Sequence, residues 1–106
     1  MKLFKNVKEG EYIFSVDSNG NAIAHNVTKR VEDWYEHTVT FTLSGLKDIK
    51  VNMNMTYWVD DNKYDTIMYF ADKNNALGAL RKLAEEANNV ILNCLKRLAI
   101  FSLKVV

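Results

Sequence analysis

Two histidines and one cysteine are the side chains of this 106-residue chain that could bind a transition metal or act as a nucleophile. His25 and His37 fall on the predicted inner face of neighbouring strands, close enough to share a metal ion or to titrate together. Cys94, on a predicted helix that faces the sheet, could be a third ligand. A structural zinc site needs four nitrogen or sulfur ligands, and no fourth stands at a suitable spacing. We therefore expect two half-buried imidazoles with backbone or tyrosine partners, and no metal or other cofactor.

The rest of the sequence carries no catalytic signature. Cys94 lies in an apolar stripe, where burial raises the pKa of a thiol and leaves it inert, so a Cys–His nucleophile is disfavoured. Asp60, Asp61 and Asp65 form a small acidic cluster at a predicted turn, but they lack the glycine and the bidentate glutamate of a calcium loop. Glycine-rich phosphate loops and the common zinc-protease and serine-hydrolase motifs are also missing. We expect a protein that is not an enzyme.

Trp34 and Trp58 are the residues best suited to recognition. In the predicted register they pair across a hairpin, on the face whose other residues are polar. An exposed aromatic pair on a sheet can stack the bases of single-stranded nucleic acid, with Lys50, Lys29 and Arg30 as phosphate ligands. The same pair can anchor a protein partner, because tryptophan and tyrosine dominate binding hot spots. Coverage of both rings by another segment of the chain is the third interpretation.

That hairpin is predicted from two runs of alternating residues. From Trp34 to Leu43 and from Ile49 to Val59, apolar or aromatic residues occupy most odd-numbered positions and polar residues most even-numbered ones. A strand turns successive side chains to opposite faces, so this alternation indicates one buried face and one solvent-facing face. A short link around Gly45 joins the two runs into an antiparallel hairpin.

A second hairpin is centred on Asn19-Gly20, the strongest short turn signal in a sequence. With these two residues as the loop, Val16 faces Ile23, and the apolar residues of both strands share one face. The returning strand runs from about residue 22 to residue 31. Residues 64–71 form another strand that is apolar on both faces, which is typical of a central strand or of a strand covered by a helix.

These strands form a meander with short links, and a twisted antiparallel sheet of this kind curls or closes into a small barrel. Residues 7–13 resemble the first strands of small SH3-like barrels, and Met1–Phe4 could add an edge strand. We predict an α+β fold with a five- or six-stranded antiparallel meander, either a curled sheet or a small SH3-like barrel, followed by one long C-terminal helix. The chain is a single domain (1–106) that comprises the β meander (1–71), the helix (72–99) and an apolar tail (100–106).

The helix is predicted from apolar residues at alternating steps of three and four, from Leu77 to Leu98. It begins after a capping residue, Asp72 or Asn74, and spans roughly 39 Å at about 1.5 Å per residue. In its first half the apolar arc covers about 120°, which one sheet can bury, but in its second half the arc widens to about 200°. The tail that follows is apolar as well.

One sheet cannot cover an arc of that width, so the second half of the helix and the tail need another surface. We predict self-association through this region, or the binding of another protein. A core helix with a tail strand that folds back onto the sheet is the competing interpretation. The residues expected at the interface are Val90, Leu92, Leu95, Ala99, Phe101 and Leu103.

The composition of the chain restricts its expected cellular location and the partners that it could bind. The net charge of +1 argues against a partner held mainly by electrostatics, such as bulk nucleic acid or an anionic membrane. No leader peptide opens the chain and no apolar run is long enough to cross a bilayer, so we expect a cytoplasmic protein that does not bind membranes. The single cysteine excludes an intramolecular disulfide. The absence of proline and the abundance of asparagine are common in proteins from AT-rich genomes, including those of phages.

The sequence therefore predicts a small non-enzymatic interaction or assembly module. We expect a homo-oligomer or the accessory subunit of a protein complex, encoded by a phage or another mobile element. The alternative is a single-stranded nucleic-acid-binding module that uses the two tryptophans.

Overall fold

The computed structural model describes residues 1–46, 48–61, 66–88 and 103–105. The chain begins with one turn of 3-10 helix, η1 (Phe4–Asn6). The elements that follow are β1 (Tyr12–Asp17), β2 (Ala22–Asp33), β3 (Thr38–Leu43), β4 (Ile49–Asn52), β5 (Tyr57–Asp61), β6 (Thr66–Phe70), α1 (Lys73–Asn88) and β7 (Leu103–Val105).

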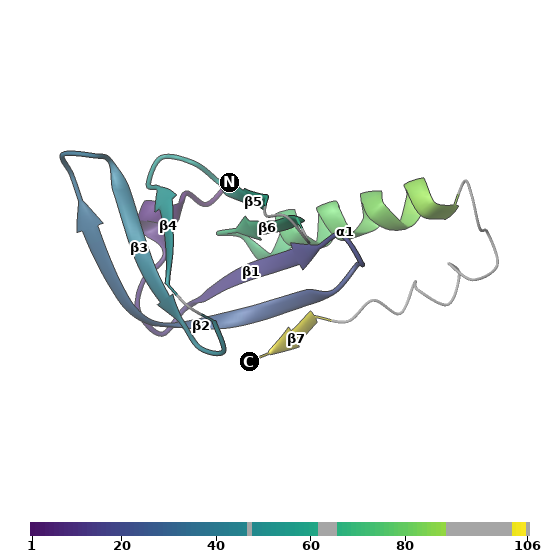
Figure 1. The fold of residues 1–106 in the computed structure, drawn as a ribbon, viewed down its shortest axis with the longest axis horizontal. Coiled ribbons are helices and arrows are strands. Elements are labelled where there is room, and N and C mark those ends of the chain that lie inside the picture. The colour runs from purple at the N-terminus through teal and green to yellow at the C-terminus, as the bar shows by residue number, and fades with distance from the viewer. Residues whose placement is uncertain (47, 62–65, 89–102, 106) are drawn as a thin grey trace.

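Strands β1 to β6 are antiparallel to their neighbours and lie in the order β4-β3-β2-β1-β6-β5. The sheet curls into a nearly closed barrel, and α1 lies on its outside (Figure 1). The predicted α+β fold, an antiparallel meander followed by a C-terminal helix, is confirmed. The last strand, β7, pairs in parallel with β2 over Ala22–Ala24, so the described part of the tail folds back onto the sheet of its own chain.

A bend in β2 allows the sheet to curl. The first part of this strand pairs with β1 and the second part with β3. The pairing with β3 shifts between Val27 and Lys29, so that Thr28 is an additional residue on β2. Such a bulge bends a strand and increases its twist. The Thr28 hydroxyl donates a hydrogen bond to the Thr42 carbonyl at 3.1 Å, which ties the bulge to β3.

The sheet carries a hydrophobic core on each side. Ile13 of β1 and Tyr69 of β6 belong to the core inside the barrel, whereas Val16 and Phe70 of the same strands belong to the core under α1. Both strands serve two cores because their side chains alternate between the faces. The predicted strand with two apolar faces is therefore confirmed for β6. The buried members of the inner core are Phe4, Val7, Ile13, Val27, Val39, Phe41, Leu43, Ile49, Val51, Met53, Tyr69 and Ala71.

The loop between β1 and β2 has three residues instead of the predicted two. Val16 lies opposite Ala22, one position away from its predicted partner. The carboxylate of Asp17 causes this difference, because it accepts the backbone N–H of Asn19 at 2.9 Å and draws the loop back onto β1. Gly20 completes the loop with a φ of 83°, the left-handed geometry that a three-residue hairpin loop requires.

The long hairpin predicted from Trp34 to Val59 is wrong at both ends. Residues 34–37 form a turn before β3, and β4 ends at Asn52. The Asn52 side chain accepts the backbone N–H of Asn54 at 2.8 Å, and the chain turns away from β3 at this point. β5 then pairs with β6, not with β3. Alternation indicates which side of a strand is buried but not which strand lies beside it, so it could not reveal this break.

The N-terminal segment lies against the chain where β4 ends. The backbone N–H groups of Phe4 and Lys5 donate to the carbonyls of Met55 and Met53, each at 2.9 Å. Phe4 enters the barrel, with its ring centroid 6.3 Å from that of Phe41. The predicted edge strand at residues 1–4 is therefore wrong, because the segment makes a 3-10 turn that places this ring in the core.

Helix α1 begins where the sequence predicts. The Asp72 carboxylate accepts the backbone N–H of Asn74 at 2.9 Å, and the Asp72 carbonyl accepts the N–H of Ala76 at 3.2 Å. Asp72 therefore caps the first turn. Ala76 and Leu80 are buried against the sheet. The predicted continuation of the helix from residue 89 to residue 99 lies outside the described residues.

Replacing Phe4 with alanine is expected to lower the free energy of unfolding by about 3–5 kcal/mol. The ring is 0% exposed, so its removal leaves a cavity inside the barrel. Urea unfolding followed by circular dichroism measures this change. Lys5→Ala, at the exposed neighbouring position, is the control and should alter the free energy by less than about 0.5 kcal/mol. Equal losses in the two variants would show that the Phe4 ring does not support the barrel.

Candidate functional site

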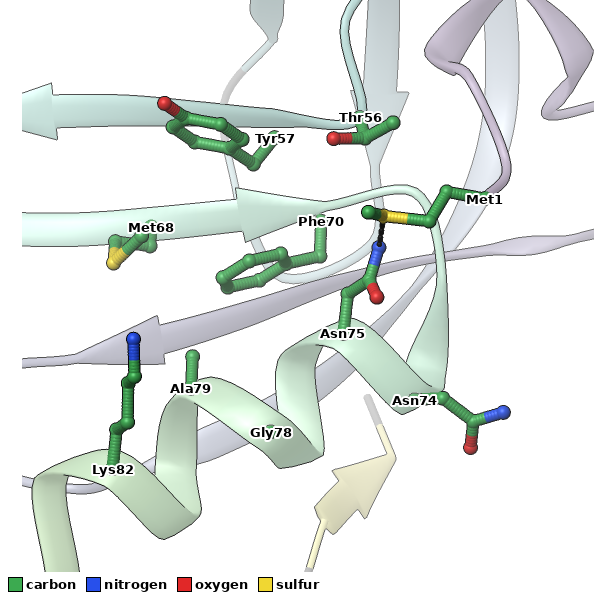
Figure 2. Close-up of a pocket in the computed structure, with 10 residues that line it drawn as sticks. All are labelled: Met1, Thr56, Tyr57, Met68, Phe70, Asn74, Asn75, Gly78, Ala79 and Lys82. Carbon is green, nitrogen blue, oxygen red and sulfur yellow. Dashed lines mark hydrogen bonds between the residues drawn. The ribbon is translucent and has the colours of Figure 1, made fainter.

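An apolar groove of about 510 Å³ runs beside α1, on the side where β6 and β5 extend past the helix (Figure 2). Strands β5 and β6 form its floor, and α1 forms one wall. The residues that line it are Met1, Thr56, Tyr57, Met68, Phe70, Asn74, Asn75, Gly78, Ala79 and Lys82.

The groove exists because a helix is narrower than the sheet that it covers. Adjacent strands are about 4.8 Å apart, so the strands β7, β2, β1, β6 and β5 span roughly 19 Å between the outer axes. A helix with its side chains is only about 10 Å wide. α1 packs on β1, β6 and β2, and it leaves the β5 side of the sheet open. Tyr57 and Val59 of β5 are accordingly 44% and 43% exposed.

Large apolar side chains form the floor of the groove. Phe70 of β6 points toward α1, and Met68 of β6 and Tyr57 of β5 line the same groove (Figure 2). Tyr57 lies directly opposite Phe70 in the pairing of the two strands, and their ring centroids are 6.5 Å apart. A surface of this composition gains free energy when another apolar surface excludes water from it, by about 25 cal/mol for each Å² buried.

The wall formed by α1 is flat because its residues are small. Gly78 and Ala79 line it, and a Cβ atom added at Gly78 would meet no other atom within 4 Å. A glycine inside a helix costs about 1 kcal/mol relative to alanine. None of the described atoms fills the space beside Gly78, so a second polypeptide can approach the helix backbone closely there.

Polar groups occur mainly at the ends of the groove. The Asn75 amide donates a hydrogen bond to the sulfur of Met1 at 2.9 Å, and Lys82 stands at the opposite end (Figure 2). Among the described residues that line the groove there is no carboxylate, histidine or cysteine. The described lining is therefore suited to contact with an apolar surface.

Sequence reasoning missed this groove. Its signal was the second apolar face of residues 64–71, together with Tyr57 and Val59 at alternate positions of the preceding run. The register of β5 with β6 places Tyr57 and Val59 beside Phe70 and Met68, and no sequence pattern specifies that register. The width of the sheet relative to one helix also follows only from the strand order.

The predicted pairing of Trp34 with Trp58 is wrong. Trp34 lies in the turn between β2 and β3, where its indole N–H donates to the Glu32 carboxylate at 2.7 Å and the residue is 62% exposed. Trp58 lies on β5, opposite Tyr69 of β6. Because the chain leaves β3 at Asn52, the two rings come from different hairpins and do not form one aromatic face.

Two of the three predicted phosphate ligands already have carboxylate partners. The Lys50 ammonium lies 2.6 Å from Glu36, and this hydrogen bond raises the pKa of Lys50. Arg30 Nη1 lies 2.7 Å from Glu32, and its Nη2 donates to the Lys5 carbonyl at 3.1 Å. Lys29 is exposed. Phosphate binding would have to compete with these ion pairs.

Trp58 and Lys50 do line one small pocket, of about 180 Å³, between β4 and β5. Asp48 and Asp60 line the same pocket, so its carboxylates would repel a phosphate group. The pocket also contains Tyr69, whose pKa is raised by burial and by the negative charge of Asp60. Because of these carboxylates, the pocket is less suited to binding nucleic acid than the sequence suggested.

The two histidines do not share a site. His25 is buried inside the barrel, and its Nε2 lies 2.8 Å from the Ser15 hydroxyl. His37 is exposed and has a φ of 56°, because it ends the turn between β2 and β3 instead of lying within a strand. Burial lowers the pKa of His25, and a hydrogen bond with the Ser44 backbone partly offsets this effect. The prediction of a half-buried imidazole on the inner face is wrong for His37.

Only some of the remaining predicted residues belong to the described part of the chain. The hydroxyl of Thr66 donates to the Asp61 carboxylate at 2.9 Å, and Asp65 lies outside the described residues, as does Cys94. Within the described ranges, no group of three or more His, Cys, Asp or Glu side chains could hold a metal ion. No helix in the same ranges has the length and the apolar character needed to cross a membrane.

The predicted association residues fall mostly beyond the described ranges. Leu103 begins β7, which pairs with β2. The residues that lie outside are Val90, Leu92, Leu95, Ala99 and Phe101.

Comparisons of this chain with family models, with curated proteins and with solved structures find no match.

Because burial lowers the pKa of His25, the protein is expected to lose stability as the pH falls below about 6.5. The unfolded state binds a proton there that the folded state resists, so the free energy of unfolding falls by at most about 1.4 kcal/mol per pH unit. Above that pH, His25 is neutral in both the folded and the unfolded state, so its contribution to the free energy of unfolding no longer changes. Urea unfolding between pH 7.5 and about 5.5 measures the slope, before most carboxylates titrate.

His25→Gln should remove this slope, since the variant has no imidazole inside the barrel. His37→Asn is the matched control and should keep it, because asparagine tolerates the left-handed backbone at that position. A slope that persists in His25→Gln would place its origin in another group.

Proposed function

We propose that this protein is a non-enzymatic module that acts by self-association through its C-terminal region. The observation that supports the proposal is the apolar groove beside α1, where Tyr57 of β5 remains 44% exposed. Exposed apolar surface of this kind marks interaction sites in monomeric folds.

The sequence supplies a complementary segment immediately after α1. Residues 90–101 contain the predicted interface positions Val90, Leu92, Leu95, Ala99 and Phe101. The apolar arc expected for the predicted helix over residues 90–99 is wider than one sheet can bury. Leu103 starts a strand that pairs with β2, so the last residues of the tail have a partner within the chain. We therefore propose residues 90–101 as the segment that mediates the self-association.

The absence of enzymatic activity is part of the same proposal. The groove lining contains no acid–base pair, and Ser15 and His25 lie inside the barrel, where both are buried. A serine and a histidine in that position stabilise the core by hydrogen bonding and contact none of the described pockets.

Two further elements of the proposal rest on composition. A cytoplasmic location agrees with a single cysteine, because intramolecular disulfides are absent by necessity. An origin in a phage or another mobile element agrees with the lack of proline and the high asparagine content.

Wild-type protein is expected to be dimeric or larger at micromolar concentration, as measured by light scattering after gel filtration. Gly78→Arg should shift it to the monomer, because the new side chain places a charge in the apolar groove. The variant should still fold, since Gly78 has open space around it and arginine favours a helix by somewhat less than about 1 kcal/mol over glycine.

Glu85→Arg is the matched control, because it places the same side chain on an exposed position of α1 that does not line the groove. It should remain associated. A wild-type protein that is monomeric throughout the micromolar range would refute the proposed function. A folded Gly78→Arg variant that remains associated would show that the groove does not take part.

Single-stranded nucleic-acid binding is the alternative, and the structure supports it less because the two tryptophans are separate and Lys50 and Arg30 have carboxylate partners. We expect an unlabelled oligonucleotide at low salt to leave the tryptophan fluorescence unchanged. Quenching that disappears as salt is added would instead support the alternative, because phosphate contacts release counterions. Trp34→Phe and Trp58→Phe would then identify the ring involved.

A further inference from the structure

The curled sheet leaves a small pocket between its two outer strands. β4 and β5 stand at the two ends of the strand order, and no pairing between described residues joins them. The pocket between them has a volume of about 180 Å³. This is the space of roughly six water molecules, so the pocket suits one small chemical group. The residues that line it are Asp48, Ile49, Lys50, Trp58, Asp60 and Tyr69.

Aromatic and aliphatic side chains form the apolar part of this lining. Trp58 of β5 lies directly opposite Tyr69 of β6, so both side chains are on the same face of the sheet. Tyr69 and Ile49 are 3% and 8% exposed, whereas Trp58 is 38% exposed. Trp58 is therefore the aromatic residue of the pocket that a ligand can reach from solvent. The face of an indole ring attracts cations more strongly than that of any other aromatic side chain.

Two carboxylates of the pocket lack a cationic partner. Asp48 precedes β4 and Asp60 lies on β5, and neither forms an ion pair with a described residue. Lys50 also lines the pocket, but its ammonium lies 2.6 Å from Glu36. The pKa of Lys50 is raised by its hydrogen bond with Glu36 and, to a smaller extent, by the charge of Asp33. The negative charge of the two pocket carboxylates is therefore left for a ligand.

The hydroxyl of Tyr69 also lacks a partner. The residue is buried, yet its hydroxyl makes no hydrogen bond with any described residue. Buried tyrosine hydroxyls usually find a partner, because an unpaired polar group loses the hydrogen bonds that it makes in water. Burial, and then the negative charge of Asp60, raise the pKa of Tyr69, so the phenol and the carboxylate are close. An N–H group between them could donate to either oxygen.

This combination of groups favours an organic cation over other ligands. The carboxylates would repel an anion. A calcium ion needs about six to eight oxygen ligands, and within the described ranges no group of three or more His, Cys, Asp or Glu side chains could hold a metal ion. A neutral apolar molecule would displace water from Asp48 and Asp60 without replacing its hydrogen bonds. An ammonium group supplies charge and N–H donors, and its alkyl chain packs on apolar walls.

We propose that the pocket between β4 and β5 binds an alkylammonium group. A free small amine and the end of a lysine side chain of another protein share this chemistry. The indole of Trp58 faces the cation, Asp48 and Asp60 neutralise its charge, and the Tyr69 hydroxyl accepts one of its N–H groups. None of these residues lines the groove beside α1, so the inference goes beyond the proposed function and does not depend on it.

An NMR titration with n-butylammonium chloride tests the site, because this ion reproduces the end of a lysine side chain. 1-Butanol is the neutral control, and sodium chloride at equal concentration controls for ionic strength. Saturable shifts are expected at the amides of residues 48–50 and 58–60 and at the Trp58 indole N–H. The dissociation constant should be on the order of millimolar for so small a ligand. 1-Butanol should bind at least about tenfold more weakly, because it carries no charge.

Two substitutions test the assigned residues. Asp60→Asn removes one charge without changing the shape of the side chain, and Trp58→Leu removes the aromatic face. Each should raise the dissociation constant of n-butylammonium about tenfold. Asp61→Asn is the matched control and should leave the constant unchanged, because the Asp61 carboxylate accepts the Thr66 hydroxyl and does not line the pocket. If Trp58→Leu does not fold, Asp60→Asn still decides the test.

A blocked peptide with one lysine between alanines distinguishes the two sources of the ligand. Tighter binding of the peptide than of n-butylammonium would identify a protein side chain, and weaker or equal binding would identify a free amine. Either result supports the inference. Equal binding of 1-butanol, shifts that are absent from the pocket, or an unchanged constant in Asp60→Asn would overturn it. These outcomes do not depend on the oligomeric state, so the proposed function is judged separately.

Discussion

A sheet with two apolar faces has to be covered twice, and most of this structure depends on that constraint. β1 and β6 direct Ile13 and Tyr69 to one side and Val16 and Phe70 to the other. The sheet covers its inner face by curling on itself, with Phe4 inserted into the barrel. It covers its outer face with α1. The groove beside α1 lies on the outer side, because one helix does not cover the full width of the sheet there.

Several local interactions together close the sheet around its inner face. The bulge at Thr28 bends β2, so that one strand pairs with β1 and then with β3. The Asn52 side chain turns the chain out of β4, and the N-terminal segment binds the backbone that follows. Each of these interactions is a hydrogen bond between a side chain or a terminal segment and a strand end. Together they determine where strands stop, and therefore how the sheet closes.

Strand positions and the helix start could be predicted from the sequence, because alternation and capping are local properties. The alternation of residues 38–43 and 49–52 correctly indicated β3 and β4, and Asp72 correctly marked the start of α1. Strand partners could not be predicted. The same alternation continued past Asn52, where a side-chain hydrogen bond ended the pairing, and it brought Trp34 and Trp58 together incorrectly.

The groove beside α1 could not be predicted from the sequence for a related reason. Tyr57 and Met68 become neighbours of one groove only through the pairing of β5 with β6 and through the position of α1 over β1. From the sequence alone, Gly78 is only a weak position of the helix, with a cost of about 1 kcal/mol relative to alanine. Its use as a flat wall follows from the open space around it.

Two regions of the chain carry more apolar surface than the elements beside them can cover. One is the β5 side of the sheet, and the other is expected in the sequence that follows α1. On the sheet, Tyr57 and Val59 extend beyond the width of one helix. In the sequence that follows α1, the apolar arc extends beyond what one face can bury. A chain with only one of these excesses would need an unrelated partner to cover it. A chain with both could cover each with the other, which is the basis of the proposed self-association; β7 pairs with β2, and none of its residues lines the groove.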